Sequence, residues 1–526
     1  MKWVVVCLCL VAAPAFAETR TYVIAIGNNA APTNTDGEDL GTLHYADDDA
    51  ADFFSFMRPF SRGAALLTVL DGPSQRRFPE VAAEARPPTL AELRRVIAEL
   101  LPRFVADRAE GHDPVLMFFF SGHGTRGGVH SPSLALLDEP LTQEILYADV
   151  LAALPARYVH LFVDACHAEA VVRPRDAEAK GVQVTGEDVR AYAARSTLAR
   201  FVHVGAVVAT ASAGLSHEWD VYQRGVFSHE LLSALRGAAD INGDGRIEYS
   251  ELSAFLGAAN REVSDPRARL SVVVRPPQMN PRMPLVDLGR ARGALRLVGK
   301  PALLGEVFVE DELGNRLLDL HAEPGSAVNV VLPVGRILYV RGTLGEVSLS
   351  PRADSVLAFE DMRFQKATTA TRGSLDGSLQ RGLFAASYGP HYYRGYVDKN
   401  EELVPVPLEP SPPLPITTAN PWLRVAQAKS PGDDRDQDRR VALGLYGSGV
   451  GLGIGAVILG ALAGQQISIY NGTDLERPAS EAQHNAIAFA LPALTALVLS
   501  AVAVGVGTHY DKRSKRHDPN RLAFSW

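Results

Sequence analysis

Residues 115–124 read Val-Leu-Met-Phe-Phe-Phe-Ser-Gly-His-Gly, and residues 158–167 read Tyr-Val-His-Leu-Phe-Val-Asp-Ala-Cys-His. Neither apolar run alternates with polar residues as a half-exposed strand does, so both are predicted to be central strands buried on both faces. Further strand-like runs lie at 22–26, 65–70 and 204–210, with amphipathic helical stretches between them. This alternation predicts an α/β fold with a mostly parallel sheet and flanking helices.

The two central runs end in side chains that can work together. Parallel strands bring their carboxyl ends to one edge of a sheet, where open α/β sheets bind ligands. If the two strands are neighbours, about 4.8 Å apart, His123 and Cys166 lie together there. A thiol with its usual pKa of about 8.5 is mostly protonated at neutral pH, and a nearby imidazole activates it by taking the proton. We therefore predict Cys166 as nucleophile and His123 as its acid/base partner, with the amide N–H of Gly124 as an oxyanion donor. His167 is the weaker base candidate, because neighbouring side chains on an extended segment diverge.

These segments resemble the paired histidine and cysteine motifs of caspase-like peptidases, family C14, and most closely those of metacaspases and their bacterial relatives. The resemblance extends from Thr21 to Leu288 and includes the segments 22–27 and 43–50. It implies a caspase-like catalytic domain over residues 18–290 that hydrolyses peptide bonds through a cysteine-linked acyl-enzyme.

The chain departs from the family pattern next to the predicted nucleophile. Ala168-Glu169 stands where Ser-Gly is usual, and Ala165 stands where Ser is common. Neither departure removes a catalytic group. They leave open the alternative of a catalytically silent caspase-like protein that acts as a calcium-responsive scaffold or interaction protein.

The resemblance also implies a specificity. In metacaspases and paracaspases an acidic pocket selects Arg or Lys before the scissile bond, and Asp164 and Asp49 match its two aspartates, with Glu218 as a looser third candidate. For Asp49 the alternative is an ordinary solvated helix charge within 47–49. The polar stretch 170–201 is predicted to be an exposed loop. Its basic residues are candidate self-cleavage sites: Arg173, Arg175, Lys180, Arg190 and Arg195.

Residues 240–251 read Asp-Ile-Asn-Gly-Asp-Gly-Arg-Ile-Glu-Tyr-Ser-Glu, which reproduces an EF-hand loop with its turn glycine at the sixth position. Helices are predicted on both sides, at 227–239 and 249–259, as the motif requires. The alternative is a helix-loop-helix that binds no ion, because a single EF-hand is often weak. The predicted Ca²⁺ ligands are Asp240, Asn242, Asp244, Arg246, Glu248 and Glu251.

The first 17 residues predict export. A basic residue, an apolar run and a small-residue end at 15–17 are typical of a cleavable secretory signal peptide. The mature chain would begin at Glu18. Cys166 would then be its only thiol, because Cys7 and Cys9 fall within the signal, and no disulfide within the mature chain would be available.

The rest of the chain predicts a spacer and a membrane anchor. Residues 291–403 contain short β-rich runs punctuated by Gly and Pro, which predict a small β-sandwich without a catalytic cluster. A Pro-rich, charged linker follows at 404–440. At about 1.5 Å per residue, each of the uncharged stretches 441–464 and 486–508 is long enough to cross a hydrocarbon core of about 30 Å. They predict a two-helix transmembrane hairpin, followed by a basic tail at 509–526.

The charges around the hairpin conflict with the signal peptide. Arg439 and Arg440 before it, and the basic residues after it, favour a cytoplasmic position for both of its ends. Long exported domains cross largely regardless of charge. We therefore follow the signal peptide and expect an extracytoplasmic (periplasmic), membrane-anchored catalytic domain.

Composition narrows the range of partners. The net charge of -8 and the pI near 6.0 give no broad basic surface, which argues against a general nucleic-acid binder. The hairpin lacks the intramembrane charges that mark a transport pathway. The expected partners are a polypeptide substrate and a membrane.

Overall fold

The computed structural model describes residues 17–31, 41–125, 133–165, 200–210, 218–220, 222–264, 270–300, 305–365 and 382–408. Outside these residues lie Cys166, residues 170–199 of the predicted exposed loop, the transmembrane hairpin, the basic tail and the signal peptide apart from Ala17. Within the described ranges, no helix combines the length and the apolar character that a membrane crossing requires.

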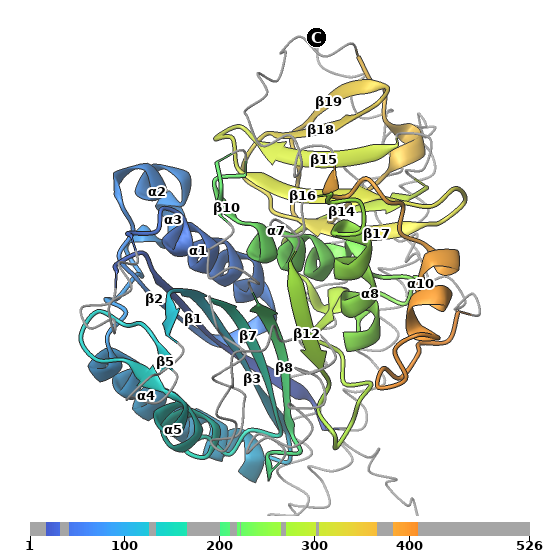
Figure 1. The fold of residues 1–526 in the computed structure, drawn as a ribbon. Helices are drawn as coiled ribbons and strands as arrows, with labels where there is room; N and C mark the ends of the chain where they lie inside the picture. Colours follow the sequence, from blue (N-terminus) through green and yellow to red (C-terminus); the bar gives the residue numbers. More distant parts are fainter. Residues whose placement is uncertain are drawn as a thin grey trace, which may run out of the picture. The chain divides into compact units, whose positions relative to one another are not determined.

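A six-stranded sheet lies at the centre of the amino-terminal half (Figure 1), in the order β12-β8-β7-β3-β1-β2. Five strands run parallel, and β12 pairs antiparallel with β8 at one edge. The predicted parallel sheet is confirmed, with the two apolar runs as its middle strands, whereas the antiparallel edge strand was not predicted. The strands are β1 (Thr19–Asn28), β2 (Ser61–Thr68), β3 (Asp113–Gly122), β7 (Tyr158–Ala165), β8 (Val204–Thr210) and β12 (Ser271–Arg275).

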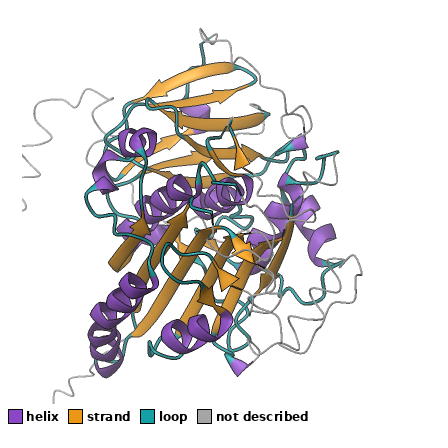
Figure 2. Ribbon diagram, turned by 60° about the vertical axis from the view of Figure 1, so that its left-hand side comes forward, coloured by secondary structure: helices purple, strands orange, loops and turns teal. Residues whose placement is uncertain are grey.

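Helices cover both faces of this sheet (Figure 2). One face carries α1 (Ala46–Met57), α7 (Val226–Ser233) and α8 (Tyr249–Ala259), and the other carries α4 (Leu90–Ala109). The other α-helices among the described residues are α2 (Gly72–Arg77), α3 (Pro79–Ala82), α5 (Gln143–Ile145) and α10 (Pro390–Val397). Short 3₁₀- or π-helical turns cover Arg58–Phe60, Leu146–Leu151, Ala234–Ala238, Leu288–Arg290 and Phe359–Asp361.

Successive side chains of β3 enter two different hydrophobic cores. Phe119 packs on the side of α1, where its ring stacks on Phe53 with centroids 4.5 Å apart. Phe118 and Phe120 pack on the side of α4. All four rings are fully buried. Because both faces of the strand are covered, its sequence shows no polar alternation.

Beyond residue 291 the chain forms two small sheets, in the orders β17-β14-β20 and β16-β15-β18-β19. The strands fall where β-rich runs were predicted, and we call residues 291–365 the β-rich segment. Their buried side chains belong to the same hydrophobic cluster as α7 and α8, and Figure 1 shows them on the side of α7 that faces away from the large sheet. The strands are β14 (Leu295–Gly299), β15 (Glu306–Asp311), β16 (Arg316–His321), β17 (Val328–Leu332), β18 (Leu338–Gly342), β19 (Gly345–Leu349) and β20 (Ser355–Ala358).

Three small sheets of very short strands complete the described part of the fold. One small sheet joins β4 (Gly124–Thr125), β5 (Ser133–Leu134) and β6 (Leu141–Thr142). Another pairs β9 (Glu218–Trp219) with β10 (Arg224–Gly225), and a third pairs β11 (Arg246–Ile247) with β13 (Val286–Asp287).

Candidate active site

His123 follows directly after β3 and is held in place by backbone contacts. Its carbonyl oxygen accepts a hydrogen bond from the amide of Ala135 at 2.9 Å. The side chain is buried, and its Nε2 lies 2.8 Å from the carbonyl oxygen of Gly41. The preceding Gly122 has a φ of +156°, and a side chain there would meet the carbonyl oxygen of Asn28 at 3.0 Å. The imidazole is therefore fixed at the carboxyl end of β3.

The contact with Gly41 assigns different roles to the two ring nitrogens of His123. A carbonyl oxygen only accepts hydrogen bonds, so Nε2 carries the hydrogen and Nδ1 carries the lone pair of the neutral ring. Burial lowers the pKa of His123 below its usual value, which favours the neutral ring at pH 7. A neutral imidazole with a basic nitrogen can take the proton of a thiol.

Cys166 is the next residue after β7 and lies outside the described residues. The parallel register of β3 and β7 pairs Ser121 with Asp164 and Gly122 with Ala165. The last paired residues are thus the immediate predecessors of His123 and Cys166. The two strands end side by side, as the sequence predicted. Gly124 begins β4 and pairs with Leu134, and its role as an oxyanion donor stays a prediction.

The three predicted substrate-binding acids lie around one glycine. A side chain on Gly225 would meet Oδ2 of Asp164 at 2.6 Å and Oδ2 of Asp49 at 2.9 Å, so both carboxylates face the same point. Glu218 lies on β9, which pairs with the strand that carries Gly225. Burial, and to a smaller extent the charge of Asp164, raises the pKa of Glu218. We call Asp49, Asp164 and Glu218 the acidic cluster.

Neutral donors hold each carboxylate of the acidic cluster. Asp49 accepts hydrogen bonds from the hydroxyl of Ser121 at 2.9 Å and from the amide of Gly225 at 3.1 Å. Oδ2 of Asp164 accepts from the hydroxyl of Ser228 at 2.7 Å and from its amide at 3.2 Å. These bonds orient the carboxyl groups of Asp49 and Asp164.

Glu218 is held in the same manner by the chain just before α1. Its side chain accepts hydrogen bonds from the amides of Tyr45 at 2.7 Å and His44 at 3.0 Å. The acidic cluster is thus assembled from α1, β7 and β9, three elements that are far apart in the sequence.

Asp49 is the most deeply buried member of the cluster. Burial, and next the charge of Asp164, raises the pKa of Asp49 well above its usual value. The alternative of a solvated helix charge is wrong, because Asp47, Asp48 and Asp49 are each at most 2% exposed.

A buried ion network behind the cluster was missed by the sequence analysis. Arg224, next to Gly225, is completely buried and donates to Asp52, one turn along α1 from Asp48. Arg236 donates to the other oxygen of Asp52 at 2.7 Å. Burial alone would raise the pKa of Asp52, but the charges of Arg236 and Arg224 lower it below its usual value. No sequence motif marks these residues, because only the folded chain brings them together.

The EF-hand-like loop has the expected glycine turns, with φ of +75° at Gly243 and Gly245. Asp240 accepts hydrogen bonds from the amides of both glycines, at 2.8 and 2.9 Å. Glu251 accepts from the amides of Ile241 and Glu248, at 3.0 and 2.8 Å. Both acids are buried, and burial raises the pKa of Asp240 to about 7.

One predicted ligand of this loop has another partner. Glu248 receives two hydrogen bonds from the guanidinium of Arg282, at 2.8 and 2.9 Å. Across the described part of the chain, no group of three or more His, Cys, Asp or Glu side chains is arranged to hold a metal ion. The calcium site stays a prediction.

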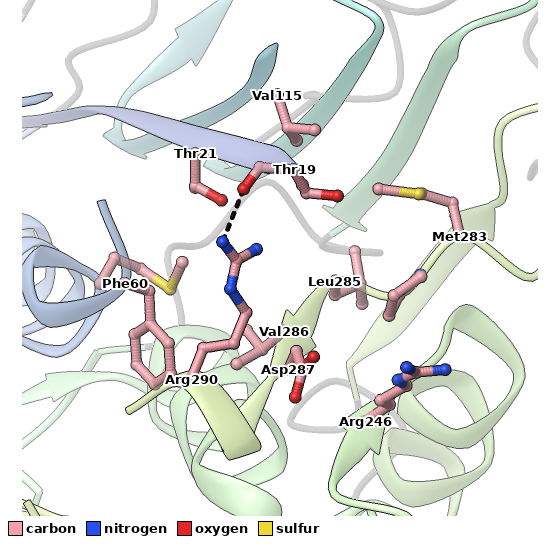
Figure 3. A pocket seen from close by; sticks show the side chains of 12 residues that line it. Thr19, Thr21, Phe60, Val115, Arg246, Met283, Leu285, Val286, Asp287 and Arg290 are labelled. Carbon is pink, nitrogen blue, oxygen red and sulfur yellow. Dashed lines mark hydrogen bonds between the residues drawn. The ribbon is translucent and has the colours of Figure 1, made fainter. Parts of the chain in front are cut away.

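Two cavities differ in their relation to the site. A cavity of about 420 Å³ lies against the start of α1, and His44 and Tyr45, whose amides hold Glu218, line it together with Leu313 of the β-rich segment. A cavity of about 240 Å³ lies at the amino ends of β1 and β3, where Arg290 reaches the carbonyl oxygen of Thr19 (Figure 3). Because His123 is at the carboxyl end of β3, the second cavity is not part of the site.

Comparison with known proteins gives one match. A family model described as the caspase domain, of the C14 peptidases, matches residues 21–285, about half of the 526-residue chain. No curated protein and no solved structure gives a significant match.

The raised pKa of Asp49 predicts how Asp49→Asn changes stability with pH. Above about pH 4 the unfolded chain loses the proton of this carboxyl while the folded chain keeps it, so wild-type stability falls as pH rises towards the folded pKa. Asparagine has the shape of the protonated acid and does not titrate. The stability of Asp49→Asn relative to wild type should therefore increase from pH 5 to pH 8, by at most about 1.4 kcal/mol per pH unit, in urea unfolding. A difference that stays constant over this range would mean that Asp49 is ionised in the folded protein.

Proposed function

The chain belongs to the caspase family of C14 peptidases, and we propose that it hydrolyses peptide bonds with Cys166 as nucleophile and His123 as acid and base. The observation that carries the proposal is the parallel pairing of Gly122 with Ala165, the residues that precede His123 and Cys166. A buried, neutral His123 with its lone pair on Nδ1 supports the role of base.

In the proposed reaction Nδ1 of His123 takes the thiol proton, and the sulfur of Cys166 attacks the carbonyl carbon of the substrate. The amides of Gly124 and Cys166 stabilise the oxyanion that forms. Collapse of this intermediate breaks the peptide C–N bond, and the leaving amine takes the proton from His123. A water molecule then gives its proton to His123 and attacks the thioester. The C–S bond breaks, the peptide carboxyl product leaves, and the thiol is restored.

We propose that cleavage follows Arg or Lys. The acidic cluster supports this because three carboxyl groups approach one another beside the end of β7, and burial, and next the charge of Asp164, raises the pKa of Asp49. A guanidinium or ammonium would favour the ionised forms of these acids and bind them through charge-assisted hydrogen bonds. An aspartate would instead meet like charge.

Further parts of the proposal concern residues outside the described ranges. These parts rest on sequence patterns alone. They are export through the amino-terminal signal, anchoring through the hairpin at 441–464 and 486–508, and self-cleavage within 170–201. Access of an added protease to the catalytic domain in intact cells and in spheroplasts tests the extracytoplasmic location.

We also propose that Ca²⁺ binds the loop 240–251. The support is the pair of buried acids Asp240 and Glu251, since burial, and next the charge of Asp240, raises the pKa of Glu251 well above its usual value. Such acids gain from a divalent cation. Asp240, Asn242, Asp244, the carbonyl oxygen of Arg246 and Glu251 would hold the ion, whereas Glu248 would have to leave Arg282 to reach it.

The first prediction of the proposed function concerns the nucleophile. A peptidyl electrophile should label Cys166 much faster than it labels a small free thiol at pH 7, and His123→Ala should slow this labelling at least about 100-fold, since it removes the base. Mass spectrometry of the labelled chain gives the rate and the position, with Cys166→Ala as control. Labelling no faster than that of the free thiol would favour the silent-scaffold alternative.

The second prediction tests specificity with matched substrates. A fluorogenic peptide with Arg before the bond should be cleaved at least about 30-fold more efficiently than the same peptide with citrulline, which has the same shape without the charge. Asp164→Asn should remove most of this difference in kcat/KM.

Asp220→Asn is the matched control, because this exposed acid lies near Glu218 and bonds the hydroxyl of Tyr45 instead. Preferred turnover of a peptide with Asp before the bond would contradict the assignment, as would an equal effect of Asp220→Asn.

The third prediction tests the calcium loop without reference to activity. Millimolar Ca²⁺ should raise the melting temperature, because a ligand present at 100 times its Kd stabilises the folded state by about 2.7 kcal/mol. Glu251→Gln should abolish the shift, whereas Glu262→Gln, on an exposed residue after α8, should keep it. An unchanged melting curve in Ca²⁺ would favour a loop that binds no ion.

A further inference from the structure

The edge strand β16 of the β-rich segment receives donors from the catalytic half at every second residue. Asn315, just before the strand, accepts from Nε of Arg77 at 2.7 Å. The carbonyl oxygen of Leu317 accepts from Nη1 of Arg236 at 3.0 Å. Asp319 lies 2.7 Å from Nε2 of His229. Three donors from three different elements thus lie along one edge strand.

The same donors hold the elements that carry the acidic cluster. Arg77 also donates to Asp48 at 2.6 Å, and Arg236 to Asp52 at 2.7 Å, and both acids flank Asp49 on α1. His229 follows Ser228 on α7, and it is Ser228 that gives Asp164 two hydrogen bonds. Contacts of β16 and contacts of the acidic cluster therefore lie on consecutive residues of α7.

The contact between His229 and Asp319 is completely buried on both sides. Burial lowers the pKa of His229 to about 4, so the ring is neutral and its Nε2–H donates to the carboxylate. Asp319 is fixed in turn by two hydrogen bonds from Arg316, at 2.6 and 2.7 Å. The hydroxyl of Ser233, at the end of α7, accepts from the amide of Asp319 at 3.1 Å. Breaking a buried contact of this kind leaves unpaired polar groups, so α7 has one favourable position against β16.

We propose that β16 positions the acidic cluster, and that Asp319 is a positioning residue for Asp164, acting through His229 and Ser228 on α7. The inference rests on the proposed role of the cluster in binding the substrate cation. Ion pairs and charge-assisted bonds depend on donor-acceptor geometry, so a small shift of α7 weakens recognition without touching the nucleophile. The β-rich segment thereby becomes part of the specificity apparatus and not only a spacer.

The test uses p-aminobenzamidine, an arginine mimic, with the full chain and fluorescence titration. Asp319→Ala should weaken its binding about tenfold, the loss of about 1.4 kcal/mol. Asp319→Asn keeps an oxygen acceptor for Nε2–H of His229 and should stay within about twofold of wild type. The rate at which iodoacetamide alkylates Cys166 should not change in either variant.

Glu80→Ala is the matched control, because it removes the bonds from Arg336 that join α3 to the β-rich segment away from α7. It should leave mimic binding within about twofold of wild type. Wild-type affinity in Asp319→Ala would overturn the proposal, and so would equal weakening by Glu80→Ala, which would indicate general loosening of the two parts.

Two further measurements keep the proposal open to refutation. If Asp319→Ala does not fold, Ser233→Ala removes one bond of the same contact and should weaken mimic binding about threefold; wild-type affinity there overturns the proposal. If wild type does not bind the mimic, the proposed specificity fails, and amide hydrogen exchange decides the positioning. Exchange at Gly225 and Ser228, whose amides bond the cluster, should rise in Asp319→Ala or Ser233→Ala but not in Asp319→Asn or Glu80→Ala, and no rise refutes the proposal.

Discussion

The parallel pairing of β3 with β7, buried on both faces, is the constraint on which the rest of the site depends. A slip of one residue would move Phe119 and its neighbours into the wrong core, and both cores are filled, so the register is strongly fixed. With the register fixed, the residues that follow the two strands must emerge beside each other. Covalent geometry therefore brings two chemically complementary residues together without any local motif joining them. The same pairing sets Ser121 opposite Asp164. Asp164 belongs to the acidic cluster, and the hydroxyl of Ser121 donates to Asp49, another of its members.

Helix α1 shows how one short segment can hold several buried acids in different electrostatic states. Asp52 faces Arg224 and Arg236, which outweigh the effect of burial and lower its pKa. For Asp49, less than one turn away, burial and the charge of Asp164 outweigh the charge of Arg224, and its pKa is raised. The difference comes from the direction of each side chain, not from depth, because both are almost completely buried. One side of the helix thus holds an ionised acid paired with arginines, and the other holds an acid whose ionised form a cationic ligand would favour.

The sequence predicted those features that depend on local pattern, and missed those that depend on the meeting of distant residues. Unbroken apolar runs marked β3 and β7, and His123 followed from its position after one of them. The three acids of the cluster were found only through resemblance to a family, since no spacing in this chain links Asp49 to Glu218. Arg224 and Asp319 carried no signal, because a buried arginine or aspartate is recognisable only beside its partner. The antiparallel edge strand β12 was missed for a similar reason: strand direction is set by the connection and not by composition.

The interface between the catalytic half and the β-rich segment combines apolar packing with buried hydrogen-bonded charges. Apolar contacts tolerate small changes of angle, since dispersion and burial are not directional. Polar contacts, such as a guanidinium on a carbonyl oxygen or an imidazole on a carboxylate, form only within a narrow range of angle and distance. Such buried groups add little net stability compared with an apolar replacement, and leaving one of them unpaired is costly. At Gly237 the backbone adds a steric limit, because a side chain there would meet the carbonyl oxygen of Asn329 at 2.0 Å. The polar contacts of β16 therefore do more to select one orientation of α7 than to strengthen the interface, and the orientation of α7 sets the position of the donors to Asp164.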